Sequence, residues 1–259
     1  MRAPAVPVPA ATTLLLRDGG SGVEVFMVKR HHEIAFAAGA LVFPGGRVDR
    51  SDRDPEIAAL ADGLDGLAPD LHPIAVAALR ESFEEAGILV AREDETGDFI
   101  GSGRCQALQY CREEIEEGAI SFASVLRRER LRLACDQLVP FAHWITPKSM
   151  PKRFDTHFFL ARVPPGQDGR HCGRESVDSL WVSPHDIAGG WGRLMFPTKM
   201  NLSKLARSRN VGEALAAARA APPVTIEPWT EETPHGKYVR IREDAGYTQT
   251  RIPLSETLP

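Results

Sequence analysis

The sequence contains no long hydrophobic run. Its apolar stretches are shorter than the ~20 residues that a membrane-spanning helix needs. Near the first residue, Pro4, Pro7 and Pro9 interrupt the apolar residues that a secretory leader would require. We therefore expect no membrane partner and a cytoplasmic location, with a short loose tail that leads into the first strand.

Cysteine pairs and excess positive charge are also missing. The four cysteines are spread through the chain without a C-x-x-C pair, which argues against a zinc or redox motif and favours reduced thiols. Lysine and arginine number 31 against 35 acidic residues, so the formal net charge is -4. Nucleic-acid-binding domains are usually strongly basic, and we expect no nucleic-acid partner.

What is present is typical of a globular protein. Hydrophobic residues make up 43% of the 259 residues and charged residues 25%, which predicts a single elaborated domain over residues 1–259. Strand-like and helix-like segments mix without regular alternation, which predicts an α+β fold. Strands are expected at residues 11–18, 23–30, 40–46, 138–147, 153–163, 179–187, 224–230 and 238–243. The turn DGGSG between the first two strands predicts a hairpin. Helices are expected at 73–86 and, as a pair, at 201–219.

Two segments look like additions to this framework. Residues 50–72 are polar and rich in turn-forming residues, which predicts an inserted loop with a short helix inside it. Residues 103–132 carry runs of charge, which predicts one or two surface helices with solvated faces.

The helix expected at 73–86 has a proline in its first turn and is followed by Gly87, a residue suited to a C-terminal cap. At ~100° per residue, Glu84 and Glu85 lie about 60° and 40° to either side of Glu81, opposite an apolar face. Carboxylates this close repel each other unless a cation lies among them. Their oxygens suit Mg²⁺ or Mn²⁺, although a solvent-exposed acidic face is the alternative.

A glycine turn, FPGG at residues 43–46, precedes this helix. Gly45 and Gly46 allow positive φ and close approach of the backbone to a ligand, so their carbonyls suit a metal and their amides a phosphate. A plain turn is the alternative interpretation of these residues taken alone.

Together, GGRVDRSD and RESFEEAGI resemble the Nudix box of the Nudix hydrolases. Gly46 matches the first glycine of that pattern, and Arg80, Glu81, Glu84, Glu85, Gly87 and Ile88 match its second half. Asp52 stands where the family has glutamate, Ser82 stands at an apolar position, and a 20-residue insertion at 53–72 lengthens the loop before the helix. Loop closure entropy grows only slowly with length, so this insertion leaves the helix intact. The family fold is an α/β/α sandwich around a mixed sheet.

The resemblance implies a catalyst that hydrolyses a diphosphate linkage. Glu81, Glu84 and Glu85 would hold Mg²⁺ or Mn²⁺ together with the Gly45 carbonyl, and Arg80 would orient them by paired hydrogen bonds. We expect Arg80, Glu81 and Glu84 to be catalytic, with Glu81 as the first candidate general base and Glu175 as the second. We do not expect Asp52 to be a ligand.

Upstream, Arg30, Gly39 and the FPGG end resemble the coenzyme A-type Nudix hydrolases, and the insertions resemble the peroxisomal-type acyl-CoA diphosphatases. This implies coenzyme A or acyl-CoA as substrate, giving 3′,5′-ADP and (acyl-)4′-phosphopantetheine. The expected substrate contacts are Arg30, Gly45, Gly46, Arg47 and Arg153, with Lys29 and Lys152 also available. No role is assigned to His31, His32, His143 and His157.

Two other functions remain open at this point. One is a Nudix enzyme for ADP-ribose, a dinucleotide or a nucleotide sugar, and the other is a Nudix domain that senses a ligand without turnover. Three retained carboxylates argue against the sensor. We expect a helical insertion at about 100–135 and a C-terminal extension at about 201–259, which would serve as a homodimer arm or cover the site.

Overall fold

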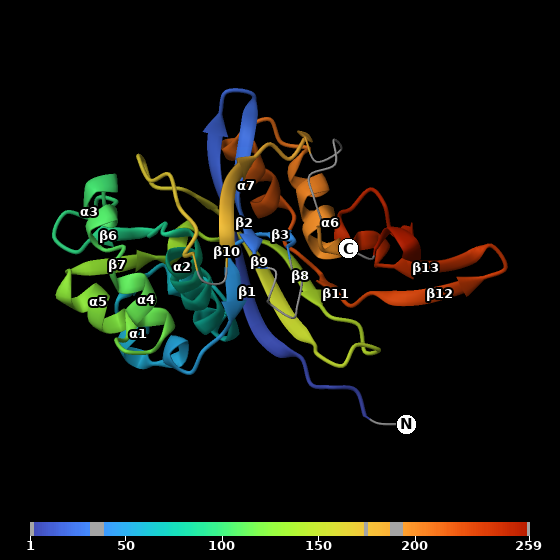
Figure 1. Cartoon of the computed structure of the whole chain (residues 1–259), viewed down its shortest axis with the longest axis horizontal. Helices are drawn as coiled ribbons and strands as arrows, with labels where there is room; N and C mark the ends of the chain where they lie inside the picture. Colours follow the sequence, from blue (N-terminus) through green and yellow to red (C-terminus); the bar gives the residue numbers. More distant parts are fainter. Residues whose placement is uncertain (1–2, 32–38, 174–175, 187–193, 258–259) are drawn as a thin grey trace.

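The computed structural model describes residues 3–31, 39–173, 176–186 and 194–257. A mixed sheet runs through the middle of the molecule in the order β10-β2-β1-β9-β8-β11, with short β3 and β4 paired to β2 and β1 (Figure 1). Its strands are β1 (Val8–Gly19), β2 (Gly22–Arg30), β3 (Leu41–Val42), β4 (Gly45–Arg47), β8 (Val139–Ile145), β9 (Phe154–Arg162), β10 (Ser176–Val182) and β11 (Thr225–Ile226). The predicted α+β class is confirmed.

The central strands are apolar on both faces. β1 and β2 form the predicted antiparallel hairpin, with Gly19 opposite Gly22, and β1 pairs with β9 in parallel. Along β1, Leu15 joins one hydrophobic cluster while Leu14 and Leu16 join another on the opposite face. A strand buried on both faces requires a layer on each side, and each layer is present.

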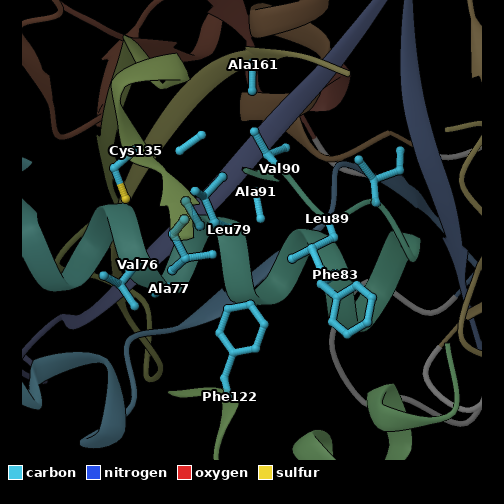
Figure 2. Close-up of a cluster of buried hydrophobic side chains, with 14 of the residues drawn as sticks. Val76, Ala77, Leu79, Phe83, Leu89, Val90, Ala91, Phe122, Cys135 and Ala161 are labelled. Atoms are coloured by element: carbon cyan, nitrogen blue, oxygen red, sulfur yellow. The ribbon is translucent and has the colours of Figure 1, made fainter. Parts of the chain in front are cut away.

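One layer is built on α2 (His72–Ala86), the predicted carboxylate helix. Leu79 and Phe83 are fully buried and belong to one hydrophobic cluster (Figure 2). Burying one such side chain stabilises the fold by about 1.5–3 kcal/mol. Gly87 ends the helix in the left-handed conformation at φ 65°, where it donates its N–H to the carbonyl of Phe83 at 2.9 Å. The predicted cap is confirmed.

The two inserted segments form an accessory layer beside α2. β5 (Ala61–Asp62), from the first insertion, pairs in parallel with β7 (Leu131–Ala134), and β7 pairs with β6 (Ala91–Glu93). Helices of this layer are α1 (Pro55–Ala59), α3 (Ser102–Ala107), α4 (Cys111–Glu116) and α5 (Phe122–Arg128). Insertions distant in sequence therefore fold onto each other (Figure 1).

The expectation of one or two solvated surface helices at 103–132 is wrong. That stretch forms three short helices whose inner faces are buried, and Phe122 stacks on Phe83 of α2 at 6.1 Å between ring centroids (Figure 2). The charge runs mask this face because Ile115 lies between two glutamates and Leu126 is followed by two arginines, yet both pack into the core.

The opposite layer consists of the predicted helical pair, α6 (Phe196–Leu205) and α7 (Val211–Ala220). A second sheet, β12 (Trp229–Thr233), β13 (Gly236–Arg240) and β14 (Arg251–Pro253), follows it. Tyr247 anchors this C-terminal segment, because its hydroxyl donates to Asn201 Oδ1 at 2.6 Å and accepts from Trp144 Nε1 at 3.2 Å. The β12–β13 hairpin projects away from the body (Figure 1), and its role as a dimer arm stays a prediction.

Short 3-10 turns connect these elements. They are Ser51–Arg53, Leu64–Gly66, Pro69–Leu71, Cys135–Gln137, Glu243–Ala245 and Leu254–Glu256. Over the described residues, none of the helices combines the length and the apolar character needed to cross a bilayer.

Candidate active site

Two of the three glutamates of α2 are buried and the third is nearly so. Glu84 and Glu85 are 7% and 8% exposed, and the Glu81 side chain is 13% exposed. A solvated acidic face would leave such side chains open to water, so that interpretation does not hold. The residues instead form one wall of a cavity of about 650 Å³.

Arg80 connects the carboxylates, and each of its five N–H groups has an acceptor. Nε and Nη2 donate to the two oxygens of Asp52 at 2.8 and 2.9 Å. Nη1 donates to Glu81 Oε1 and to Glu84 Oε2, both at 2.9 Å, and Nη2 also donates to the Arg47 carbonyl at 3.0 Å. A guanidinium held at five points fixes the carboxylates around it.

Asp52 is therefore a support for Arg80. Its side chain is fully buried, and Oδ2 also accepts the backbone N–H of Asp49 at 2.7 Å. In the sequence, Asp52 stands out only because it lies six residues after Gly46. In the structure, its carboxylate binds Arg80.

The charges in this cluster do not balance. Burial raises the pKa of Glu81 to about 7 and the pKa of Glu84 to about 8, although the Arg80 charge opposes both shifts. Burial alone would lower the pKa of Arg80, but Asp52 and Glu81 raise it above its ordinary value. The single positive charge of Arg80 is shared among Asp52, Glu81 and Glu84, so it offsets the desolvation of the two glutamates only in part. Their all-oxygen donor set suits a hard divalent ion, so these residues fit Mg²⁺ or Mn²⁺.

Gly45 and Gly46 contact the carboxylates directly. The N–H of Gly45 donates to Glu85 Oε2 at 2.9 Å. The expectation of positive φ at the FPGG turn is wrong, since both glycines lie in strand β4 without it. Glycine is needed for space: a Cβ on Gly46 would lie 2.5 Å from Glu81 Oε1, and one on Gly45 would lie 2.4 Å from the Ala11 carbonyl oxygen.

Helix α4 of the second insertion supports the last turn of α2. Arg112 is 9% exposed, and its Nε and Nη2 donate to the Glu84 carbonyl at 3.1 and 2.9 Å. Nη2 also donates to the Arg170 carbonyl at 2.9 Å. Helix ends leave carbonyls without helical partners, and a buried arginine satisfies this one. The sequence analysis missed Arg112 because only the tertiary fold brings α4 to α2.

The remaining walls of the cavity come from the sheet and from basic side chains. Ala10, Thr12, Phe154 and Thr156 line it from β1 and β9, and Arg30, Arg47 and Lys152 line it with positive charge. The Lys152 ammonium lies 5.3 Å from the centroid of the Phe154 ring. Carboxylates on one wall and cations on another suit a polyanion that is bound together with a metal ion.

Most predicted site residues meet in this cavity. Its lining includes Arg30, Gly45, Gly46, Arg47, Arg80, Glu81, Glu84 and Glu85. Within the described part of the chain, Arg153 lies outside that lining: it donates to the carbonyls of Thr146 and Ala5 and to Glu227. Glu175, the second candidate base, lies outside the described residues.

Sequence reasoning missed several wall residues. Glu116 of α4 and Cys172 line the cavity although one lies in a charged run and the other in a loop. Phe154 and Thr156 lie on one face of β9, because side chains alternate between the two faces of a strand. The sequence shows this alternation, but it does not show which of the two faces lines the cavity.

Comparisons with known proteins agree with this geometry. The sequence model of the NUDT19 Nudix domain matches residues 63–193, half of the chain. The acyl-coenzyme A diphosphatase NUDT19 of Xenopus laevis is 25% identical over 209 residues, 65% of this chain and 54% of that protein. Nudix hydrolase 7 of Caenorhabditis elegans is 26% identical over 162 residues, 62% of this chain and 47% of that protein. The chain spans about half the length of these curated relatives.

A solved structure is similar over most of its length. The NUDIX hydrolase from Alicyclobacillus acidocaldarius aligns with a TM-score of 0.69 and 27% identity, covering 82% of this chain and 96% of that one. The two structures therefore share the α+β fold. The residues matched by the family model, 63–193, include the carboxylate helix α2. The chain belongs to the Nudix hydrolases, in the family of the NUDT19 Nudix domain.

Proposed function

We propose that the protein hydrolyses the diphosphate linkage of coenzyme A or of an acyl-CoA in a reaction that depends on Mg²⁺ or Mn²⁺. The products are 3′,5′-ADP and 4′-phosphopantetheine or its acyl form. The observation that carries the proposal is the gathering of Glu81, Glu84 and Glu85 on one wall of a cavity that Arg30, Arg47 and Lys152 also line. The match to the NUDT19 Nudix domain supports the choice of substrate.

Glu81, Glu84 and Glu85 would hold the metal. When bound, a divalent ion neutralises phosphate charge and makes a bound water a better nucleophile. Arg80 keeps Glu81 and Glu84 in one orientation, because its Nη1 donates to both carboxylates. The Gly45 amide orients Glu85 in the same way.

Glu81 is the first candidate for the general base. Its pKa of about 7, raised by burial, lies near the working pH, where a carboxylate accepts and releases a proton most effectively. Glu116 reaches the cavity from α4 and is an alternative source of a carboxylate.

Substrate phosphates would meet the basic wall. Coenzyme A carries a diphosphate and a separate 3′-phosphate, so its site needs several positive charges. Arg30, Arg47 and Lys152 provide them from three separate segments of the cavity lining. Gly45 and Gly46 line the same cavity. Arg153 is not part of this proposal, since its guanidinium is engaged by three partners in the fold.

The test is a substrate panel with purified protein and each metal. Coenzyme A, an acyl-CoA, ADP-ribose and NADH are incubated with Mg²⁺ or Mn²⁺, and products are separated by chromatography. We expect 3′,5′-ADP from the coenzyme A substrates and loss of turnover on removal of the metal. Glu84→Gln should lower kcat by at least about 100-fold, within the range of electrostatic contributions to catalysis, while Glu95→Gln, at an exposed loop acid, serves as the control.

Other outcomes assign other functions. Much faster cleavage of ADP-ribose or NADH would replace the coenzyme A assignment and keep the diphosphatase reaction. Binding of a nucleotide without turnover of any substrate in the panel would overturn the enzymatic proposal in favour of a ligand sensor.

A further inference from the structure

Two histidines and an aspartate gather on the sheet face turned away from the cavity. His143 of β8 and His157 of β9 lie opposite each other in antiparallel register, and Asp155 precedes His157 by two residues on the same face. Side chains alternate along a strand, and Phe154 and Thr156 of β9 line the active-site cavity. The cluster therefore lies on the other face of β9 from Phe154 and Thr156, and none of its three residues lines the cavity.

The side chains of the cluster are already close together. The His143 and His157 rings stack with centroids 3.8 Å apart and an angle of 18° between their planes. One ligand atom from each of the three residues lies within 4.8 Å of the others. His143 Nε2 contacts Asp155 Oδ1 directly.

Thr225 fixes the orientation of His143. Its Oγ1 lies 2.9 Å from His143 Nδ1, so the second ring nitrogen, Nε2, faces Asp155. Ligand histidines in metal sites use this arrangement, in which one nitrogen is held by an outer oxygen and the other is aimed at the ion. Burial and the neighbouring His143 lower the pKa of His157 to about 4, and the charges of Asp155 and Asp70 only partly oppose this shift.

We infer that His143, His157 and Asp155 form a second metal site, specific for a borderline ion such as Zn²⁺ or Co²⁺. Imidazole nitrogens select these ions over Mg²⁺, which prefers oxygen ligands. A tetrahedral zinc ion holds its ligand atoms about 3.3 Å apart. Side-chain rotations that move the ligand atoms by about 1 Å would therefore bring them to this spacing. Three protein ligands leave the fourth position to water.

The site would brace the strands that form the back of the cavity. A bound ion joins β8 to β9 directly, and Thr225 connects it to β11 after α7. The side chains of His143 and Asp155 are 17% and 35% exposed, so an ion can reach them from solvent. Since it binds the folded state, the ion raises the thermal stability of the protein.

The probe is Co²⁺ added to tag-free, metal-depleted protein in excess Mg²⁺. Magnesium occupies oxygen sites such as the α2 carboxylates and competes poorly for imidazole. We expect one equivalent of Co²⁺ to bind with visible absorption bands, to be displaced by Zn²⁺, and to raise Tm. His157→Gln and Asp155→Asn should lose the bands, and Thr225→Val should weaken binding by about 10-fold. His235→Gln, at an exposed turn histidine, is the matched control.

Circular dichroism checks that each variant is folded. If a variant of a ligand residue unfolds, the Co²⁺ affinity of Thr225→Val, which keeps all three ligands, tests the inference instead. Absence of Co²⁺ binding by the wild type under excess Mg²⁺ overturns the inference, leaving a plain His–Asp hydrogen bond with stacked rings. Equal binding by wild type and His157→Gln overturns it as well. Because the cluster lies outside the cavity, His157→Gln should retain most Mg²⁺-dependent turnover, which keeps this test separate from that of the proposed diphosphatase.

Discussion

At the scale of single residues, the site depends on how Arg80 distributes its donors. Two go to Asp52, two to Glu81 and Glu84, and one to the Arg47 carbonyl. The sequence indicated the arginine and the glutamates through their spacing. It did not indicate that Asp52, one methylene shorter than the family residue, still reaches the guanidinium, because that contact depends on the path of the loop.

Asp52→Asn tests this support. The change removes a fully buried charge that faces Arg80, and the new amide N–H group opposes the guanidinium donors. We expect the free energy of unfolding to fall by about 3 kcal/mol, the typical cost of breaking a buried ion pair. Misplaced Glu81 and Glu84 should also lower kcat by about 10-fold or more. Urea unfolding and steady-state kinetics measure both effects, with exposed Asp65→Asn as the control. An unchanged unfolding midpoint would mean that the pair adds no stability.

Glu84→Gln should affect stability in the opposite direction. The Glu84 pKa of about 8 in the folded protein, raised by burial, exceeds the ordinary value of 4.5. Between these values the folded state holds a proton that the unfolded state has released, so the unfolding free energy of metal-free protein falls as pH rises. Glutamine removes this penalty, which is about 1.4 kcal/mol per pKa unit at most.

Urea unfolding of metal-free wild type and Glu84→Gln at pH 5 and pH 8 measures the difference. We expect the variant to gain about 1–3 kcal/mol over the wild type at pH 8 and little at pH 5. A variant that is less stable than the wild type at pH 8 would show that Glu84 is not strained by burial.

At the scale of elements, regular segments were predictable and their packing was not. The hairpin of β1 and β2 and the helix α2 follow from local patterns, since alternating aliphatic residues, a proline start and Gly87 are short-range signals. The inner faces of the second insertion were missed because Ile115 lies between two glutamates and Leu126 is followed by two arginines. The pairing of β5 with β7 joins two insertions, and no local pattern encodes such a contact.

Arg112→Met tests the contribution of α4 to the site. The change keeps an apolar stem but leaves the buried Glu84 carbonyl and the partly buried Arg170 carbonyl without their guanidinium donor. An unsatisfied buried polar group costs about 1–3 kcal/mol, so we expect the free energy of unfolding to fall by about 2 kcal/mol. Turnover should fall too, because Glu84 belongs to the turn that loosens.

The readouts are the urea midpoint and kcat for Arg112→Met and for Arg127→Met, an exposed arginine on α5. If the two variants have the same urea midpoint and the same kcat, Arg112 does not stabilise the end of α2.

At the scale of the whole molecule, the two faces of β9 belong to two chemically different places. The α2 carboxylates and the basic wall meet in the cavity, while the histidine cluster lies on the opposite face of β9. The family resemblance fixed the first place from the sequence. The second depends on the strand register and on the C-terminal β11, so the sequence order of His143, Asp155 and His157 did not reveal it.

The central claim is that the crowd of buried acids on α2 is built around a divalent cation. Calorimetric titration of metal-free protein with Mn²⁺ at pH 6 and pH 8 tests it most directly. The raised pKa values of Glu81 and Glu84, about 7 and about 8, mean that binding must release protons. We predict tighter binding at pH 8, proton release at pH 6, and loss of this binding in Glu84→Gln. Binding of equal strength at both pH values and in the variant would contradict the account.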